Sequence, residues 1–578
     1  MEDGRQVKRT RHAPASSASA AGGGFESDEE RQRREERERN LRQQITDTEG
    51  LLSYMMAFLP INLMVQLAKS IWQHAAPDLS DVPISSATKE ERSFWQHVRL
   101  AFVTQLAARL THLTSITLHH PIGFSCWCLD VFVAMVEGHI AGRRAADLTG
   151  GTLQTVAIEE GARLTGPAGQ SVARTHPPLP APLDPPPTLH ALTTIAVLQN
   201  DHRQLADRGW LMPSLAIVQQ CGCWWDADRL GQFISSSRSL RRVVYRLNGE
   251  DWARVFERIP AAPAGQQGGP LAQLESIGTI LLFNNSPAGV ERLQQVLVAR
   301  GCQQSLKQLH VQFCFVFCID RHSLPILLAL DRLVGTCCRQ DAPLTFRTTA
   351  HCGFDLSIFY NTDFPSHPSP SFKTMLQQLA QQATSVQYTF TQDGLTDPHT
   401  DPSPSAIEMA SSLAFDKVVW VDVENAIGFH PPADTPPPHP AIISHLKPFP
   451  KASELNVWSD LGGAAGQLLA AKMPKQLTKV YIYKVLGAEE VRRVDGAGKG
   501  EGVPDDLEDA GSFVHTQLSS VTPHMRGLQC VELGVDTTTA EQHGCIEASL
   551  EGTNIDAFSV TRIVISATRV TITAARTA

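Results

Sequence analysis

The stretch Gly301–Cys314, GCQQSLKQLHVQFC, carries the pattern that predicts the fold. Apolar residues and a closing cysteine occupy relative positions 0, 3, 5 and 8, namely Leu306, Leu309, Val311 and Cys314. Leu309 and Val311 alternate along a short strand, so we expect both side chains on one side of it. Leu306 would enter the same core from the preceding turn. The chain leaves the strand at Cys314, where an Asn or Cys side chain can hydrogen-bond the open backbone of the neighbouring coil.

The same spacing recurs three times upstream, in Leu192-Ile195-Val197-Asn200, Leu240-Val243-Tyr245-Asn248 and Ile277-Ile280-Leu282-Asn285. Successive closing residues lie 48, 37 and 29 positions apart. The pattern resembles the leucine-rich repeat, whose regular period is about 20–29 residues. Only the last gap fits that period, so unrelated buried strands of an ordinary α/β domain are the alternative. Three Asn and one Cys at the same offset favour the repeat.

We therefore predict an α/β fold: a right-handed leucine-rich-repeat-like solenoid with parallel strands on one face and helices on the other. Gly301 is expected to end a helix, because glycine tolerates the left-handed cap conformation. Further strands are predicted at Leu113-Ile116-Leu118, Leu153-Val156-Ile158, 386–390, 418–423, 455–457, Leu477-Val480-Ile482, Leu528-Val531-Leu533 and Val560-Ile563-Ile565. Helices are predicted at 94–110, 126–140, 226–236, 289–300, 323–338 and 372–383, and loops at 78–88, 165–187, 396–405, 430–440 and 487–506.

The N-terminal residues differ in character from the rest of the chain. Residues 1–25 are small and polar, so they cannot bury a core and are expected to be disordered. The Lys8-Arg9/Arg11 cluster fits either a nuclear import signal or a solvated tail. Residues 26–44 are rich in Glu–Arg pairs without an apolar stripe, which predicts a solvated helix.

A helical hairpin is predicted over 51–76, where apolar residues recur at helical spacing on both sides of Leu59-Pro60. Pro60 ends the first helix and is well placed to start the second. Together with Leu63, Leu67-Ala68 and Trp72, this Leu-Pro resembles the F-box. A helical hairpin that only caps the end of the solenoid is the alternative.

An F-box-like hairpin ahead of leucine-rich-like repeats resembles the F-box/leucine-rich-repeat substrate receptors of cullin-based (SCF-type) ubiquitin ligases. The resemblance implies that the hairpin binds an adaptor subunit and that the strand face of the repeats holds a protein substrate. Adaptor contact would fall on Leu52, Met56, Leu59, Pro60, Leu63, Leu67, Ile71 and Trp72. On the strands, Lys307, His310 and Gln312 are outward-facing candidates for substrate contact, although they could equally be solvated. A repeat scaffold with no ligase link is the alternative function.

These expectations divide the chain into a tail and charged helix (1–45), an F-box-like region (46–99), a first solenoid half (100–383) and a degenerate second half (384–578). Whether the two halves form one continuous solenoid is left open at this point. The long loops are expected on one face of the solenoid.

Composition limits the classes of partner. The formal net charge is −9, which argues against a general nucleic-acid binder. No run approaches 18 apolar residues and no signal peptide is recognisable, so we expect no membrane partner and a cytoplasmic or nuclear location. The 12 cysteines are too few for a disulfide scaffold and are interpreted as buried, reduced residues.

The sequence contains no motif that predicts catalysis, a metal or a cofactor. Nucleophile elbows, phosphate loops and H-E-x-x-H motifs are missing. The Cys126/Cys128 and Cys221/Cys223 pairs lack the usual zinc spacing, and Cys337-Cys338 are adjacent. We therefore expect a protein-binding function, no enzymatic activity and no cofactor.

Overall fold

The computed structural model describes the chain in segments. The described residues are 28–47, 79–84, 88–120, 127–160, 179, 181–196, 205–219, 226–261, 268–283, 286–313, 317–340, 342, 344–347, 352–390, 402–425, 441–457, 471–474, 477, 479–485, 528, 530–536, 554–555, 558–565 and 569–576. The chain divides into two compact units, Met1–Ser80 and Asp81–Ala578.

In the first unit, the structure describes helix α1, Asp28–Asp47. The side chains described along it are exposed, and Arg33 pairs with Glu29 one turn earlier at 3.9 Å. The prediction of a solvated charged helix is confirmed. All eight residues predicted to bind an adaptor, from Leu52 to Trp72, lie outside the described residues.

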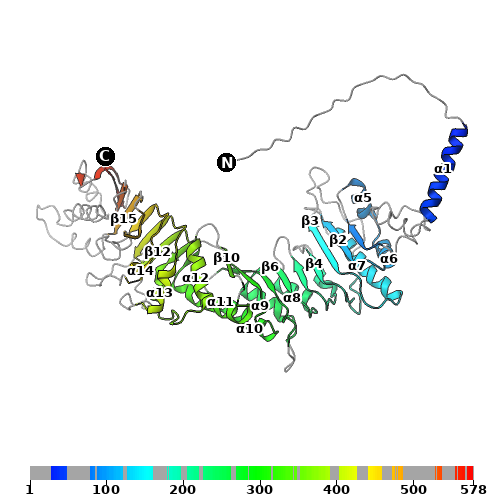
Figure 1. The fold of residues 1–578 in the computed structure, drawn as a ribbon, viewed down its shortest axis with the longest axis horizontal. Coiled ribbons are helices and arrows are strands. Elements are labelled where there is room, and N and C mark those ends of the chain that lie inside the picture. Colours follow the sequence, from blue (N-terminus) through cyan, green and yellow to red (C-terminus); the bar gives the residue numbers. More distant parts are fainter. Residues whose placement is uncertain are drawn as a thin grey trace, which may run out of the picture. The chain divides into compact units, whose positions relative to one another are not determined.

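The second unit is an α/β structure with two large sheets (Figure 1). The strands of the first sheet are β1 Asp81–Ile84, β2 Ser115–His120, β3 Thr155–Glu160, β4 Thr194–Ala196, β5 Ile217–Gln219, β6 Arg242–Asn248, β7 Ser276–Leu282, β8 Gln308–Phe313 and β10 Leu344–Arg347. Those of the second are β9 Phe317–Ile319, β11 Cys352–Asp355, β12 Ser385–Phe390, β13 Trp420–Asn425, β14 Glu454–Val457, β15 Lys479–Val485, β16 Cys530–Asp536, β17 Asn554–Ile555, β18 Phe558–Ile565 and β19 Arg569–Arg576.

Helices connect the strands. They are α5 Lys89–His97, α6 Leu100–Arg109, α7 Trp127–Ala145, α8 Ala227–Ile234, α9 Gly249–Glu257, α10 Ala288–Ala299, α11 Leu324–Cys337, α12 Pro370–Gln382, α13 Pro404–Ser412 and α14 Ala441–His445, with two 3₁₀ turns at Arg321–Ser323 and Leu356–Tyr360. Helices α8 to α14 lie along one side of the strands (Figure 1).

From β1 to β16, the paired strands run parallel and follow one another in chain order. The predicted α/β class with consecutive parallel strands is confirmed. The two sheets meet on the same two coils: Leu309 of β8 pairs with Leu344, and Cys318 of β9 pairs with Gly353. Both pairings join residues 35 positions apart, so the register is kept from one sheet to the next.

Apolar residues occupy the same register position on strand after strand, and they form the core. In the first sheet this row is Val82, Ile116, Val156, Ile195, Val218, Val243 and Ile277, each at most 2% exposed. In the second it is Ile319, Phe354, Val386, Val421, Leu455, Val480, Val531 and Ala574, each 0% exposed. No single coil can bury such a residue alone, so each depends on its neighbours.

The predicted end of the helix before the key stretch is confirmed. Gly301 has a φ of +85°, and its N–H donates to the carbonyl of Val298 at 3.0 Å. The N–H of Cys302 donates to the carbonyl of Leu297, also at 3.0 Å. These two bonds form a Schellman cap, which requires the left-handed conformation that glycine adopts without strain.

Several predicted elements were incomplete. Strands β1, β5, β10, β11, β17 and β19 and helices α9, α13 and α14 were not predicted; β1 lies inside the expected loop 78–88, and α13 begins inside the expected loop 396–405. The helix expected over 94–110 is two helices, because the chain is extended at Val98 and Arg99. Strand β5 fills the gap of 48 residues, since Thr194 pairs with Ile217 and Ile217 with Arg242, steps of 23 and 25 residues.

The predicted repeat frame at Ile277 is wrong by three residues, because Ile277 takes the second apolar position and not the first. Ile277 pairs with Val243, the second apolar position of the preceding repeat, so Leu274 takes the first position. The register shifts beyond this pair, where β7 carries Gly278. A Cβ on Gly278 would lie 1.8 Å from the carbonyl oxygen of Tyr245, so only glycine fits this close approach of two strands.

The role predicted for the closing residue is also corrected. Asn248 does not bond the neighbouring coil; its Oδ1 accepts from the backbone N–H of Asp251 at 2.7 Å and caps α9 of its own coil. The other closing residues of the four initial matches, Asn200, Asn285 and Cys314, lie outside the described residues.

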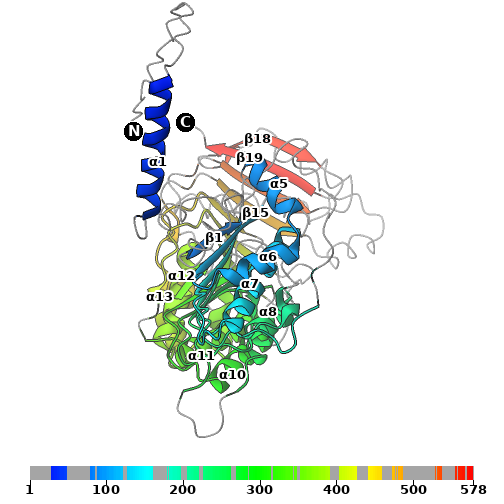
Figure 2. The ribbon, with the colours of Figure 1, turned by 90° about the vertical axis from the view of Figure 1, so that its right-hand side faces the viewer.

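The sheet does not stay parallel to its end. β19 pairs antiparallel with β16, β18 with β19, and the short β17 with β18. Figure 2 shows β18 and β19 (red) side by side. The strand predicted at Val560-Ile563-Ile565 exists as β18, but its direction departs from the predicted parallel order. Within the described residues, no helix is both long and apolar enough to cross a membrane.

Candidate functional site

Several charged residues on the helical side of the second unit pair with one another. Ion pairs on this side join neighbouring coils: Asp228–Arg258 at 2.7 Å, Glu257–Arg292 at 2.8 Å, Glu291–Arg332, and Glu408–Lys373 at 3.3 Å. Each involves partly exposed side chains and contributes little stability by itself. These charges are paired between neighbouring helices and are therefore less available to a binding partner.

The side chains that alternate with the buried rows point away from the helices, and we call their surface the outward strand face. Successive side chains of a strand point to opposite faces, so the two register rows flanking Val386, Val421, Leu455, Val480 and Val531 lie on it. The first row is Ser385, Trp420, Glu454, Lys479 and Cys530, and the second is Gln387, Asp422, Asn456, Tyr481 and Glu532.

On β13 to β16 this face combines carboxylates with aromatic rings. We define the acidic–aromatic patch as the half-buried side chains of Trp420, Asp422, Glu454, Asn456, Tyr481 and Glu532. Neighbouring strands lie roughly 4.8 Å apart, so these side chains are close neighbours even though they come from different coils.

Asp422 is the patch carboxylate with the most perturbed surroundings. Burial raises its pKa, and the side-chain amides of Asn456 and Gln387 act against this by bonding the charged form. The neighbouring charge of Glu454 raises the pKa further. The Nδ2 of Asn456 donates to Oδ1 of Asp422 at 2.5 Å, while no donor among the described residues reaches the buried Oδ1 of Asn456.

The three predicted substrate-contact candidates lie on or beside the outward strand face of the first sheet. The Nζ of Lys307 pairs with Glu275 at 2.9 Å, and Arg241 shares that carboxylate at 2.6 Å. Gln312 accepts a hydrogen bond from Arg246 at 2.7 Å, and His310 is half-buried on the same strand. Lys307 and Gln312 therefore already have partners in neighbouring coils.

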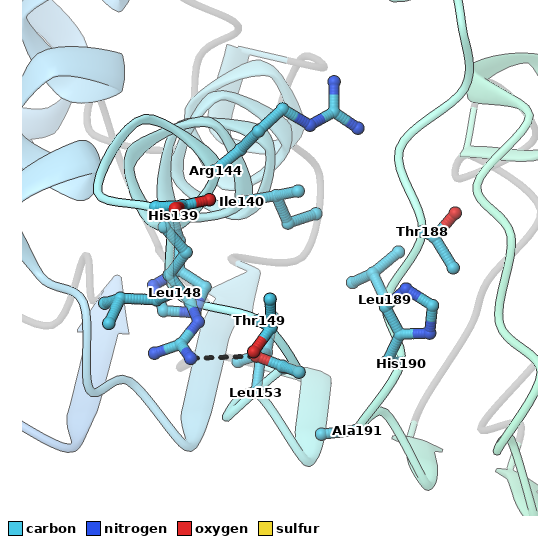
Figure 3. A pocket seen from close by; sticks show the side chains of 14 residues that line it. His139, Ile140, Arg144, Leu148, Thr149, Leu153, Thr188, Leu189, His190 and Ala191 are labelled. Atoms are coloured by element: carbon cyan, nitrogen blue, oxygen red, sulfur yellow. Dashed lines mark hydrogen bonds between the residues drawn. The ribbon is translucent and has the colours of Figure 1, made fainter.

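A cavity of about 340 Å³ lies between the end of α7 and the segment before β4 (Figure 3). His139, Ile140 and Arg144 lie on one side of it, and Thr188–Ala191 lie on the other; Arg143 also lines it. The Nη2 of Arg143 donates to the carbonyl of Gly150 at 2.8 Å. His139 is 1% exposed, and its Nδ1 lies 2.6 Å from the carbonyl oxygen of Leu110.

Burial is the main cause that lowers the pKa of His139. Its Nε2 lies 3.4 Å from the hydroxyl of Thr152, so both ring nitrogens are occupied by the protein. The guanidinium of Arg143 likewise holds the turn between α7 and β3. These groups form part of the cavity wall and hold the end of α7 to Leu110, Gly150 and Thr152.

The described cysteines fit the prediction of buried residues in part, because Cys318 and Cys530 are half-buried. Cys302 and Cys337 are fully buried, and Cys338 is 4% exposed. Burial raises the pKa of the Cys338 thiol to about 12 and that of Cys352 to about 11, which keeps both thiols protonated and unreactive at neutral pH. Among the described residues, no three His, Cys, Asp or Glu side chains are grouped to hold a metal ion. Cys126, Cys221 and Cys223 lie outside them.

Comparison with known proteins finds no protein-family model and no curated protein that match this chain.

Sequence reasoning did not find the acidic–aromatic patch. Its second row joins residues separated by 34, 25 and 51 positions, from Asp422 to Asn456, Tyr481 and Glu532. The signal available was the identity of the residue next to each buried position of a predicted strand. Aligning the strands on their buried residues would have placed these residues in one row.

Proposed function

We propose that the chain is a non-catalytic protein-interaction scaffold built as a leucine-rich-repeat-like solenoid, whose outward strand face binds a protein partner. The observation that supports this most is the pair of buried rows along parallel strands, one from β1 to β7 and the other from β9 to β16. In such a stack each coil contacts its neighbours, and strand side chains from many coils form one extended binding surface.

The two sides of the strands support the same proposal. One side is packed against helices whose charged residues pair with each other between coils. The other side presents half-buried polar and aromatic residues, a mixture typical of protein-binding surfaces. The antiparallel β17–β19 end the row of strands, and β17 has only two residues, a short edge that discourages further strand addition.

The finer proposal is that this scaffold is the substrate receptor of a cullin-based ubiquitin ligase. It rests on the F-box-like sequence 51–76 ahead of the repeats. In this role the hairpin binds the adaptor subunit, the outward strand face holds the substrate, and the chain supplies proximity to a ubiquitin-charged partner. The second candidate is a scaffold without a ligase link, which has the same strand-face function and a hairpin that only caps the repeats.

A pull-down with purified adaptor subunit separates the two candidates. The receptor proposal expects a complex with the full chain that is lost on Leu63→Asp or Leu67→Asp, because a charge enters an apolar contact. Leu148→Asp is the matched control, since Leu148 is 41% exposed in the repeats and should leave the complex intact. If the unaltered chain captures no adaptor, the receptor proposal is wrong and the scaffold proposal stands.

A further inference from the structure

We propose that the acidic–aromatic patch binds an extended protein segment that carries basic residues, with two of its cations four positions apart. The inference deepens the proposed scaffold function and rests on it. The patch presents three carboxylates, Asp422, Glu454 and Glu532, beside two aromatic rings, Trp420 and Tyr481. Arginine and lysine side chains are the partners that such a set of groups recognises, through charge-assisted hydrogen bonds and cation–π contacts.

One acceptor of the patch, Oδ1 of Asn456, lacks a hydrogen-bond donor among the described residues. Asp422 lies between the amides of Gln387 and Asn456 in one register row. The Nδ2 of Asn456 donates a hydrogen bond to Asp422, whereas the buried Oδ1 of Asn456 accepts none from the described residues. A buried acceptor left without a donor is costly, and a guanidinium or ammonium group entering the row would supply one.

The strand spacing determines the expected distance between two cations of the partner. Asp422 on β13 and Glu532 on β16 are three strands apart in the same row, roughly 14 Å at about 4.8 Å per strand. An extended segment advances about 3.3–3.4 Å per residue, so residues four apart are separated by roughly 13–14 Å and point to the same side. A segment that crosses the strands can therefore place one cation at each carboxylate.

The outward strand face of the first sheet differs from the patch in charge. The outward face of β6 carries two exposed arginines, Arg242 and Arg246, in place of carboxylates. Carboxylates repel phosphate groups, so the patch does not suit nucleic acid. A basic protein segment complements the charge of the patch and is repelled by β6, which predicts binding confined to β13–β16.

The test uses the full chain and fluorescein-labelled Gly/Ser peptides that contain two arginines, read by fluorescence anisotropy. We expect the peptide with arginines four positions apart to bind more tightly than one with arginines two apart. Binding should weaken as salt is added, and a peptide with glutamates should not bind. The double variant Asp422→Asn with Glu532→Gln should weaken binding by about tenfold or more. The double variant Arg242→Ser with Arg246→Ser is the matched control and should bind as well as the unaltered chain.

Circular dichroism of each variant verifies that it is folded. Tryptophan fluorescence gives an independent readout of binding: we expect it to change when the peptide binds, and we expect Trp420→Phe to abolish this change. Equal binding of the glutamate peptide, or unchanged binding by the Asp422/Glu532 variant, overturns the inference. The inference is also overturned if the chain forms a dimer that dissociates on Asp422→Asn, because the patch would then bind a second copy of the chain. A protein partner that is captured equally by the patch variant and the unaltered chain, without any peptide binding, overturns this inference and leaves the scaffold function intact. Absence of both peptide and partner binding overturns both.

Discussion

At the residue scale, a buried ion pair ties α7 to the segment between β4 and β5. Arg208 donates to both carboxylate oxygens of Glu137, at 2.7 and 2.5 Å, and the indole N–H of Trp210 donates to Oε1 of Glu137 at 3.1 Å. Glu137 and Arg208 are only 7% and 6% exposed. Charges this deeply buried are tolerated because each is paired and hydrogen-bonded.

Glu137→Ala should therefore destabilise the protein by about 3–5 kcal/mol, because it leaves the charge of Arg208 buried without a partner. The measurement is the free energy of unfolding from a urea titration. Replacing both Glu137 and Arg208 with leucine should recover most of the loss. Asp228→Asn, in the exposed pair with Arg258, is the control and should unfold like the unaltered chain. A Glu137→Ala variant as stable as this control would show that the buried pair contributes nothing.

The carboxyl of Asp422 predicts a pH dependence of stability. Its pKa is raised in the folded chain, chiefly by burial, so the folded state holds the proton more tightly than the unfolded state. This contribution favours folding below the unfolded pKa and is lost as the pH rises through the folded pKa. Asp422→Asn should therefore unfold at a higher temperature than the unaltered chain at neutral pH, and the difference should disappear in acid.

Thermal melts at a series of pH values measure this difference, and the hydrogen bond from Asn456 can be kept by the Oδ1 of the new Asn. A variant that is less stable at neutral pH would contradict the expected sign. A gain in stability together with lost peptide binding would mark Asp422 as a residue kept for binding at a cost to folding.

At the element scale, two glycines let α6 and α7 approach closely. A Cβ on Gly138 would lie 2.5 Å from the carbonyl oxygen of Thr104, and one on Gly142 would lie 2.0 Å from that of Ala108. The atoms in the way belong to the backbone of α6, so they cannot move without shifting the helix. The four-residue spacing places both glycines on the same face of α7.

Gly142→Ala should destabilise the protein by about 1–3 kcal/mol, because the added methyl group forces the two helices apart. Gly335→Ala in α11 is the matched control, since nothing lies within 4 Å of the added Cβ. It should stabilise by about 0.5–1 kcal/mol, as alanine favours the helix. Urea titrations of both variants measure these effects, and a similar effect of the two substitutions would refute the close contact.

At the scale of the whole molecule, the described strands of the second unit form two sheets that share one register where they meet. Leu309 pairs with Leu344 in the first sheet, and Cys318 pairs with Gly353 in the second, with the same spacing of 35 residues. The predicted halves, divided at residue 383, are also joined by paired strands, because Gly353 of β11 pairs with Ser385 of β12. The same stacking brings Asp422, Asn456, Tyr481 and Glu532 together from four coils of unequal length.

The sequence by itself determined the α/β class, most of the strands and the glycine cap at residue 301. These depend on neighbours within about ten residues, so alternation and helical spacing reveal them. It missed β5 because Gln220 takes the third apolar position of that repeat, and it missed β1 although Leu79, Val82 and Ile84 keep the required spacing.

Only the tertiary structure decided the register shift at Gly278, the antiparallel end of the sheet and the composition of the outward strand face. Each depends on which residues face one another across strands, and the connections between those strands vary from 23 to 51 residues. Period alone cannot align coils of such unequal length. Their alignment is imposed by the burial of one apolar row against the next, and the polar rows beside it are brought together as a consequence.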